Sequence, residues 1–224
     1  MLIELVILVA LVLVVVVMIR PPKAPKQTPP RRVQFTFIRH GESEANIGHF
    51  INDDPNKPVH LTEKGKVQAA TLATTLIAEN FTHAFVSEFP RAQETMAFLL
   101  KDRNIPLHID ARLNERKSGM DGQPVNAFND QVLADPLRFK TPNGESFLEQ
   151  MERVSSFVDD LVMQHPDARF LVVSHENPIL AAQGLASTPE AVVLANLANC
   201  GRVDLYVATT NTDGNARRYF TSPN

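Results

Sequence analysis

Two histidines, each placed directly after a short apolar segment, are the residues of this sequence best suited to chemistry. His40 follows the apolar, β-rich segment 33–38 after one arginine, and His175 follows the segment RFLVVS at 169–174. An imidazole nitrogen can act as a nucleophile or take part in proton transfer. Two histidines that leave neighbouring strands at the same edge would therefore predict a reaction site.

Two arginines accompany these histidines and indicate which ligand the site would hold. Arg39 directly precedes the first histidine, and Arg91 lies just after a third apolar segment, 83–87. A guanidinium group binds phosphate oxygens through two parallel hydrogen bonds. Two such groups together with two imidazoles would suit a tetrahedral phosphate dianion.

The elements that must position these side chains alternate along the chain. Short apolar segments predict buried strands, and apolar residues spaced three and four positions apart predict amphipathic helices. Strands are expected at 33–38, 83–87, 106–109, 169–174 and 202–207, and helices at 62–77, 90–100, 145–164 and after Pro178. This alternation predicts a three-layer α/β/α sandwich with a mostly parallel central sheet. Ligands of such sheets bind beyond the carboxyl ends of the strands, which is where both histidines fall.

The N-terminal segment predicts a membrane anchor. Residues 5–19 are purely apolar, and Glu4 is the one charged residue before Arg20. A helix over residues 1–20 would be about 30 Å long, close to the hydrocarbon thickness of a bilayer. The positive charge that follows this span predicts a single-pass protein of the cell membrane with its catalytic domain in the cytoplasm. Residues 21–32 (PPKAPKQTPPRR) are expected to form a stiff basic linker to a domain at 33–224.

Composition excludes several classes of function. The 224 residues carry a net charge of −3, and the first 32 hold five bases and one acid, so the body is more acidic than the whole chain. An acidic body is a poor binder of nucleic acid, and no nucleic-acid partner is expected. A single cysteine, Cys200, excludes an internal disulfide and a cysteine-based zinc site. No cofactor is expected.

Seven ordered motifs in residues 33–207 resemble the histidine phosphatase superfamily, whose members are phosphoglycerate-mutase-like proteins. They are Arg39-His40-Gly41-Glu42-Ser43 with Asn46, Leu61-Thr62-Glu63-Lys64-Gly65 with Gln68, Ser87 with Arg91, Leu113-Asn114-Glu115-Arg116 with Gly119, Gly144-Glu145-Ser146 with Arg153, Val173-Ser174-His175, and Asn199-Cys200. Each motif alone is weak, and their shared order makes the resemblance specific. It implies a phosphoglycerate-mutase-like fold.

The resemblance also implies a role for each candidate catalytic residue. His40 would attack phosphorus and form a phosphohistidine. Arg39, Arg91 and His175 would hold the transferring oxygens, with Asn46 as a neutral donor, and Ser43 belongs to the same substrate-binding motif. Glu115 would act as the general acid and then the general base, which requires a raised pKa. No metal is required, since arginine and histidine supply the positive charge.

One residue departs from the family pattern. Glu176 stands where the family usually has a small residue, commonly glycine, and Asn177 beside it is a further candidate for substrate binding. Glu176 could begin the following helix and face solvent, which is the preferred interpretation. It could instead point into the pocket and weaken anion binding, or select substrates with a cationic group. Asp53-Asp54 is interpreted as a solvated turn, although it could instead border the site, and residues 119–140 are interpreted as a lid.

Four functions follow from these residues. A short, acidic lid favours a metal-independent phosphomonoester hydrolase, which is the leading hypothesis. The alternatives are a phosphoglycerate-mutase-type phosphotransferase, a protein-phosphohistidine phosphatase, and an inactive membrane-tethered binding module in which Glu176 blocks phosphate. The expected partner is a phosphorylated small molecule or a phosphoprotein.

Overall fold

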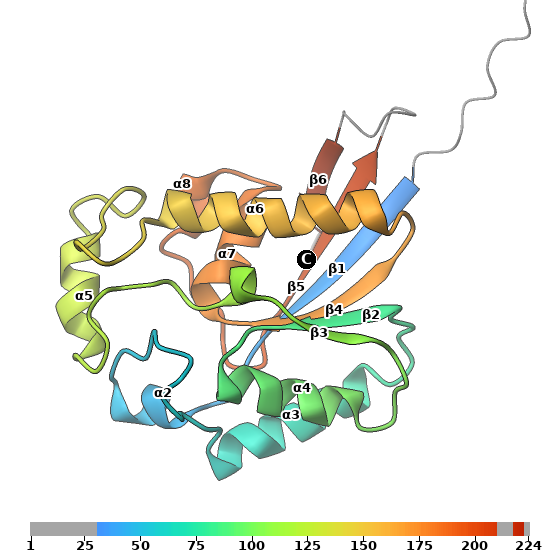
Figure 1. The fold of residues 1–224 in the computed structure, drawn as a ribbon, viewed down its shortest axis with the longest axis horizontal. Coiled ribbons are helices and arrows are strands. Elements are labelled where there is room, and N and C mark those ends of the chain that lie inside the picture. The colour runs from blue at the N-terminus through green and yellow to red at the C-terminus, as the bar shows by residue number, and fades with distance from the viewer. Residues whose placement is uncertain (1–30, 210–216, 222–224) are drawn as a thin grey trace, which may run out of the picture.

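The computed structural model describes residues 31–209 and 217–221, and a single mixed sheet forms its centre (Figure 1). The strand order is β3-β2-β4-β1-β5-β6. The strands span Arg31–Arg39 (β1), His83–Val86 (β2), Leu107–Ile109 (β3), Arg169–Ser174 (β4), Arg202–Thr209 (β5) and Arg217–Thr221 (β6). The first four strands of that order pair in parallel, whereas β5 and β6 pair antiparallel to their neighbours. The mostly parallel sheet is therefore confirmed.

Helices cover both faces of the sheet and complete three layers (Figure 1). Their bounds are Glu44–Gly48 (α2), Glu63–Thr75 (α3), Pro90–Leu100 (α4), Ala111–Leu113 (the short 3-10 helix η1), Val125–Val132 (α5), Phe147–Gln164 (α6), Glu176–Gly184 (α7) and Pro189–Val192 (α8). Helices α6 and α7 pack on one face, where Phe35, Phe157 and Phe170 are fully buried. Helices α3 and α4 pack on the other, around Ile38, Met96 and Leu171.

Helix boundaries follow the capping signals of the sequence. Thr62 accepts a hydrogen bond from the Gly65 amide at the start of α3, and Ser146 forms a capping box with Glu149 at the start of α6. The expected helix at 62–77 ends earlier, at Thr75, and Ile77 is 73% exposed. The apolar spacing overestimated the length of this helix because Ile77 matches the period without contacting the core.

The predicted location in the cell membrane is corrected by the structure. No helix within residues 31–209 and 217–221 is long and apolar enough to cross a bilayer. The longest of them, α6, is amphipathic and carries charged residues such as Glu152 and Arg153. The predicted span at 1–20 and linker residues 21–30 lie outside the described residues, while linker residues 31 and 32 belong to β1.

The pairing of β1 with β4 positions the two histidines. These central strands run parallel, with Arg39 opposite Ser174, so the next residue of each strand leaves the sheet at the same edge. The backbone amide of His40 still donates to the carbonyl of Ser174, at 3.0 Å. Residues 135 positions apart in the sequence are therefore neighbours at the carboxyl end of the sheet.

Candidate active site

His40 and His175 meet at the carboxyl edge of the sheet. Their ring centroids lie 5.1 Å apart, and the two residues are 2% and 0% exposed. His40 follows β1, and His175 is the N-cap of α7 after β4. The site is therefore built on the two central strands, whose packing on both faces fixes the backbone.

Close backbone contact holds the loop after His40. A methyl group on Gly41 would lie 2.6 Å from the carbonyl oxygen of Gly65, and one on Gly65 would lie 2.0 Å from the carbonyl oxygen of Glu42. The amide of Gly41 also donates to the hydroxyl of Thr95, at 3.0 Å. This contact requires glycine at both positions, and it presses the loop against the start of α3.

The hydrogen bonds of His40 define which ring nitrogen carries the proton and which carries the lone pair. Nδ1 lies 2.7 Å from the carbonyl oxygen of Gly41, which can only accept, so Nδ1 carries the proton. Nε2 therefore keeps its lone pair, and it accepts from Nε of Arg91 at 3.1 Å. Burial, and then the charges of Arg91 and Arg39, lower the pKa of His40 well below 6.5. The ring is thus neutral at neutral pH, as a nucleophile must be.

His175 lies behind the arginine. Its Nδ1 accepts from a terminal nitrogen of Arg91 at 3.2 Å, so its Nε2 donates to the Ser87 hydroxyl at 2.7 Å. Burial, followed by the charge of Arg91, lowers the pKa of His175 well below 6.5. Both ring nitrogens are occupied, so in this arrangement His175 orients Arg91.

Arg91 is the central cation of the site. It is the second residue of α4, the helix that follows β2 along the chain, and it is 3% exposed. Besides the two histidines, its guanidinium donates to the side chain and the carbonyl of Asn52 and lies 4.5 Å from the ring centroid of Phe89. Burial lowers the pKa of Arg91 to about 10, so the group keeps its positive charge at neutral pH.

Arg39 is paired with the residue that departs from the family pattern. Its terminal nitrogen NH1 donates to the carbonyl of Leu197 and lies 3.3 Å from a carboxylate oxygen of Glu176. The same oxygen accepts from the amide of Leu197 at 2.8 Å. Glu176 does begin α7, but its carboxylate lies on Arg39 and the residue lines the cavity. The preferred interpretation is therefore confirmed for the start of the helix and wrong for the carboxylate, which was expected to face solvent.

Glu115 is held at the cavity wall with a raised pKa. Burial raises the pKa of this carboxyl above its usual value near 4.5, although the hydrogen bond from the Arg116 amide and the charge of Arg91 act in the opposite direction. Oε1 accepts from that amide at 2.8 Å and from the side-chain nitrogen of Asn177 at 3.3 Å. Arg153 fixes the backbone of this segment through the carbonyls of Asn114 and Glu115. Asn177 thus orients a candidate acid.

Asn46 and Ser43 form a small network beside His40. The side-chain oxygen of Asn46 accepts from the amide and the hydroxyl of Ser43, each at 3.0 Å, and from Asn199 at 3.2 Å. These bonds use the oxygen and fix the amide orientation. Asn46 lines the cavity with Ser43, and its side-chain nitrogen is a donor suited to a phosphate oxygen.

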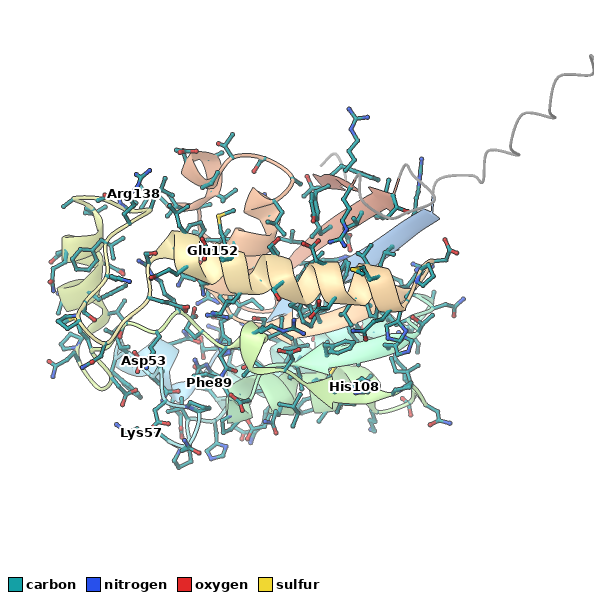
Figure 2. All side chains as sticks on the ribbon, turned by 45° about the horizontal axis from the view of Figure 1, so that its top comes forward. Asp53, Lys57, Phe89, His108, Arg138 and Glu152 are labelled. Carbon is teal, nitrogen blue, oxygen red and sulfur yellow. The ribbon has the colours of Figure 1, made fainter. Side chains whose placement is uncertain are left out.

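Asn52 is a site residue that the sequence analysis did not identify, and Asp53 is one that it preferred to place in a solvated turn. Asn52 is 5% exposed and binds Arg91 through both its side chain and its carbonyl. Asp53, labelled in Figure 2, accepts from the amide and hydroxyl of Ser118 and from the amide of Gly119 at 2.7–2.9 Å. The interpretation of Asp53 as a solvated turn is therefore wrong, since its carboxylate fastens the loop to the start of the lid. Only their place in a polar loop after the first motif signalled these residues.

These residues surround one cavity of about 510 Å³. Arg39, His40, Ser43, Asn46, Arg91, Glu115, Glu176 and Asn177 line it, together with residues of α5 from the expected lid. His108, by contrast, lies on the exposed strand β3, away from Asp53 (Figure 2). In the described ranges, no group of three or more His, Cys, Asp or Glu side chains could hold a metal ion. The arrangement can bind one phosphate group, present a neutral imidazole to it and supply a proton.

Comparison with known proteins agrees with this chemistry. The model of the histidine phosphatase superfamily (branch 1) matches residues 35–213. The chain is 33% identical to the adenosylcobalamin/alpha-ribazole phosphatase of Escherichia coli K12, over 71% of this chain and 83% of that protein. It is 28% identical to the protein named probable phosphoglycerate mutase GpmB of Cronobacter sakazakii, over 64% of this chain and 69% of that protein. The solved alpha-ribazole phosphatase of Shigella flexneri has a TM-score of 0.68 at 26% identity, covering 84% and 94% of the two chains.

Proposed function

Because the chain belongs to the histidine phosphatase superfamily (branch 1), we propose that it is a metal-independent phosphomonoester hydrolase in which His40 carries the phosphoryl group. One observation supports this most directly. The Nδ1 proton of His40 is directed to the carbonyl of Gly41, which leaves the Nε2 lone pair at a cavity that also contains Arg91 and Glu115. A neutral nucleophile, a cation and a carboxyl with a raised pKa are groups that suit phosphoryl transfer through a covalent intermediate.

In the proposed first step, Nε2 of His40 attacks phosphorus in line with the ester oxygen. The N–P bond forms while the P–O bond to the substrate alcohol breaks. Glu115 gives its proton to the leaving oxygen, which departs as a neutral alcohol. The raised pKa of Glu115 supports this role, because the carboxyl keeps its proton to a higher pH than a free one does.

In the proposed second step, water attacks the phosphohistidine on the same phosphorus. Glu115, now a carboxylate, takes a proton from the water, and the N–P bond breaks. Orthophosphate leaves, and both His40 and Glu115 return to their starting protonation states. Arg39, Arg91 and Asn46 would stabilise the charge that spreads over the phosphoryl oxygens in both steps, while His175 orients Arg91.

The geometry favours a small phosphorylated molecule over a phosphoprotein. The cavity of about 510 Å³ is the size of a small-molecule site, and α5 of the lid forms one side of it. Relatives include both a named phosphatase and a named mutase. Hydrolysis is preferred here because Asp53 and Glu176 offset two of the three arginine charges at the cavity, which leaves little excess positive charge to retain a doubly phosphorylated intermediate.

The proposal is tested by turnover of phenyl phosphate in the presence of a chelator. Wild-type protein should release phosphate, and rapid quenching should trap an acid-labile phosphohistidine. His40→Ala should lower kcat by at least about 10³-fold and abolish the trapped species, because the nucleophile is lost. His108→Ala on exposed β3 is the matched control and should retain activity. Activity that needs an added metal, or full activity of His40→Ala, would contradict the proposal.

The ion pair between Arg39 and Glu176 supports a second candidate function, an inactive binding module in which Glu176 keeps phosphate out of the site. A carboxylate on Arg39 competes with a substrate phosphate for that cation. If wild-type protein neither hydrolyses phenyl phosphate nor forms phosphohistidine, whereas Glu176→Gly does both, the binding module replaces the hydrolase as the proposed function.

A further inference from the structure

At its entrance, the candidate active site has apolar side chains, several of which are exposed to solvent. Val125, Phe128, Val132 and Leu133 line it from α5 and its C-cap, and Val193 and Leu194 line it from the segment after α8. Leu133 and Leu194 are each 63% exposed, and Val125 is 37% exposed. Large aliphatic side chains that are exposed at the edge of a concave site mark a surface that a ligand covers.

The charges of the same cavity are nearly matched. Three arginines line it, Arg39, Arg91 and Arg116, against the carboxylates of Asp53 and Glu176 and the carboxyl of Glu115, which carries a proton in the proposed first step. Among the lining residues of the described chain there is no lysine, and the lid cations Lys117 and Arg138 are exposed outside the cavity. A single phosphate would use Arg39 and Arg91 beside His40.

A second phosphate would find little to bind. Arg116, the third arginine, donates to the carbonyls of Glu145 and Phe139, and its guanidinium lies 5.1 Å from the ring centroid of Phe128. The other polar residues at the entrance, His49, Asn129 and Asn196, provide hydrogen bonds but no guanidinium or ammonium group. The electrostatics thus fit one anionic group at the base of the cavity.

We propose that the substrate is a monophosphate ester of an apolar alcohol, with its hydrocarbon part between α5 and residues 193–194 and its phosphate at His40. This inference rests on the proposed function, because it assigns the leaving group of the same reaction. Burial of the exposed side chains at the entrance would supply binding energy in proportion to the apolar area that is covered.

Three substrates with the same chain length test the proposal: hexyl phosphate, hexanediol monophosphate and hexanediol bisphosphate. They share a primary alkyl leaving group, so they differ mainly at the far end, which is a methyl group, a hydroxyl or a second phosphate. We expect kcat/KM for hexyl phosphate to exceed that for hexanediol monophosphate by about tenfold, and that for the bisphosphate by more, because the aliphatic side chains of α5 and residues 193–194 cannot hydrogen-bond to a polar end.

Variants of the entrance identify the side chains responsible. Leu133→Asn and Leu194→Asn should each lower the ratio of kcat/KM between hexyl phosphate and hexanediol monophosphate by about three- to tenfold. Leu107→Asn on β3, a residue that is 49% exposed outside the cavity, should keep the wild-type ratio. Equal rates for the three substrates, a preference for the bisphosphate, or unchanged ratios in both entrance variants would overturn this inference and leave the hydrolase in place. Absence of turnover with all three and with phenyl phosphate would overturn both.

Discussion

At the scale of single residues, the site works through opposite shifts of pKa. Burial lowers the pKa of His40 and raises the pKa of Glu115, so the histidine stays neutral to a lower pH and the carboxyl keeps its proton to a higher pH than the free groups do. Burial thus favours His40 as a neutral nucleophile and Glu115 as an acid, and both residues line the same cavity. Pairs of groups whose environments shift their pKa values apart are typical of acid–base catalysis.

The acid role of Glu115 predicts a dependence on the leaving group. In Glu115→Gln the proton donor is lost, so kcat for an alkyl phosphate should fall by about 10²–10⁴-fold. The loss should be much smaller for nitrophenyl phosphate, whose leaving group departs without a proton. Equal losses with the two substrates, measured by phosphate release at pH 7, would instead indicate that Glu115 has a structural role.

Glu176 provides a second prediction at this scale. Glu176→Gln removes the negative charge beside Arg39 but keeps an oxygen that can accept from the Leu197 amide. Relief of about 1 kcal/mol of repulsion should lower the inhibition constant of inorganic phosphate roughly fivefold. Glu63→Gln, which removes an exposed carboxylate from α3, is the control and should leave that constant unchanged. Weaker inhibition in Glu176→Gln would mean that the ion pair orients Arg39 for phosphate.

At the scale of elements, two loops connect the central strands to their surroundings. The loop after β1 contacts α3 through Gly41 and Gly65, and the loop with Asn52 and Asp53 joins Arg91 to the lid. The first loop fixes His40, the proposed nucleophile, and the second connects Arg91 to the side of the cavity that α5 lines. Both connections depend on backbone groups as much as on side chains.

The contact between α3 and the loop can be tested with one methyl group. Gly65→Ala should lower the free energy of unfolding by about 1–3 kcal/mol, because the new Cβ overlaps the backbone of Glu42 and the loop must move. Urea denaturation measures this change. Val67→Ala, on the exposed side of the same helix, should change stability by less than about 0.5 kcal/mol. A Gly65→Ala variant as stable as the wild type would show that the loop adapts freely.

At the scale of the whole molecule, the buried histidines make stability depend on pH. The unfolded chain binds a proton at each histidine below about pH 6.5, whereas His40 and His175 in the folded protein bind one only at a much lower pH. The stability that these two histidines contribute to the folded protein is therefore fully present above about pH 6.5. It is lost as the pH falls from there toward their pKa values in the folded protein.

This dependence predicts a difference between variants. Between pH 6 and pH 5, His175→Gln should show a smaller fall in unfolding free energy than the wild type, by up to about 1.4 kcal/mol per pH unit, because one of the two groups is removed. Urea titrations at both pH values measure the slopes. Met163→Gln, an exposed change without a titratable group, should keep the wild-type slope. The same slope in His175→Gln would show that His175 is protonated in the folded state.

The sequence by itself determined the family, the alternation of strands and helices, and the residues of the cavity that the ordered motifs contain. Apolar segments and capping residues are local signals, so β4 and α4 were predicted with the bounds that the structure has. Strand β6 and helices α2, α5 and α8 were not predicted individually. These elements are short or lie in polar stretches, where local periodicity is weak.

Only the tertiary structure decided how these residues meet. Three features depend on contacts between segments that are far apart in the sequence. They are the direction in which the Glu176 carboxylate points, the hydrogen bonds between Asn52 and Arg91, and the hydrogen bond from Arg91 to His175. The apolar entrance likewise combines α5 with residues 193–194. Spacing along a chain records local backbone geometry, whereas the direction of a buried charge is set by the partners that folding brings within hydrogen-bond distance.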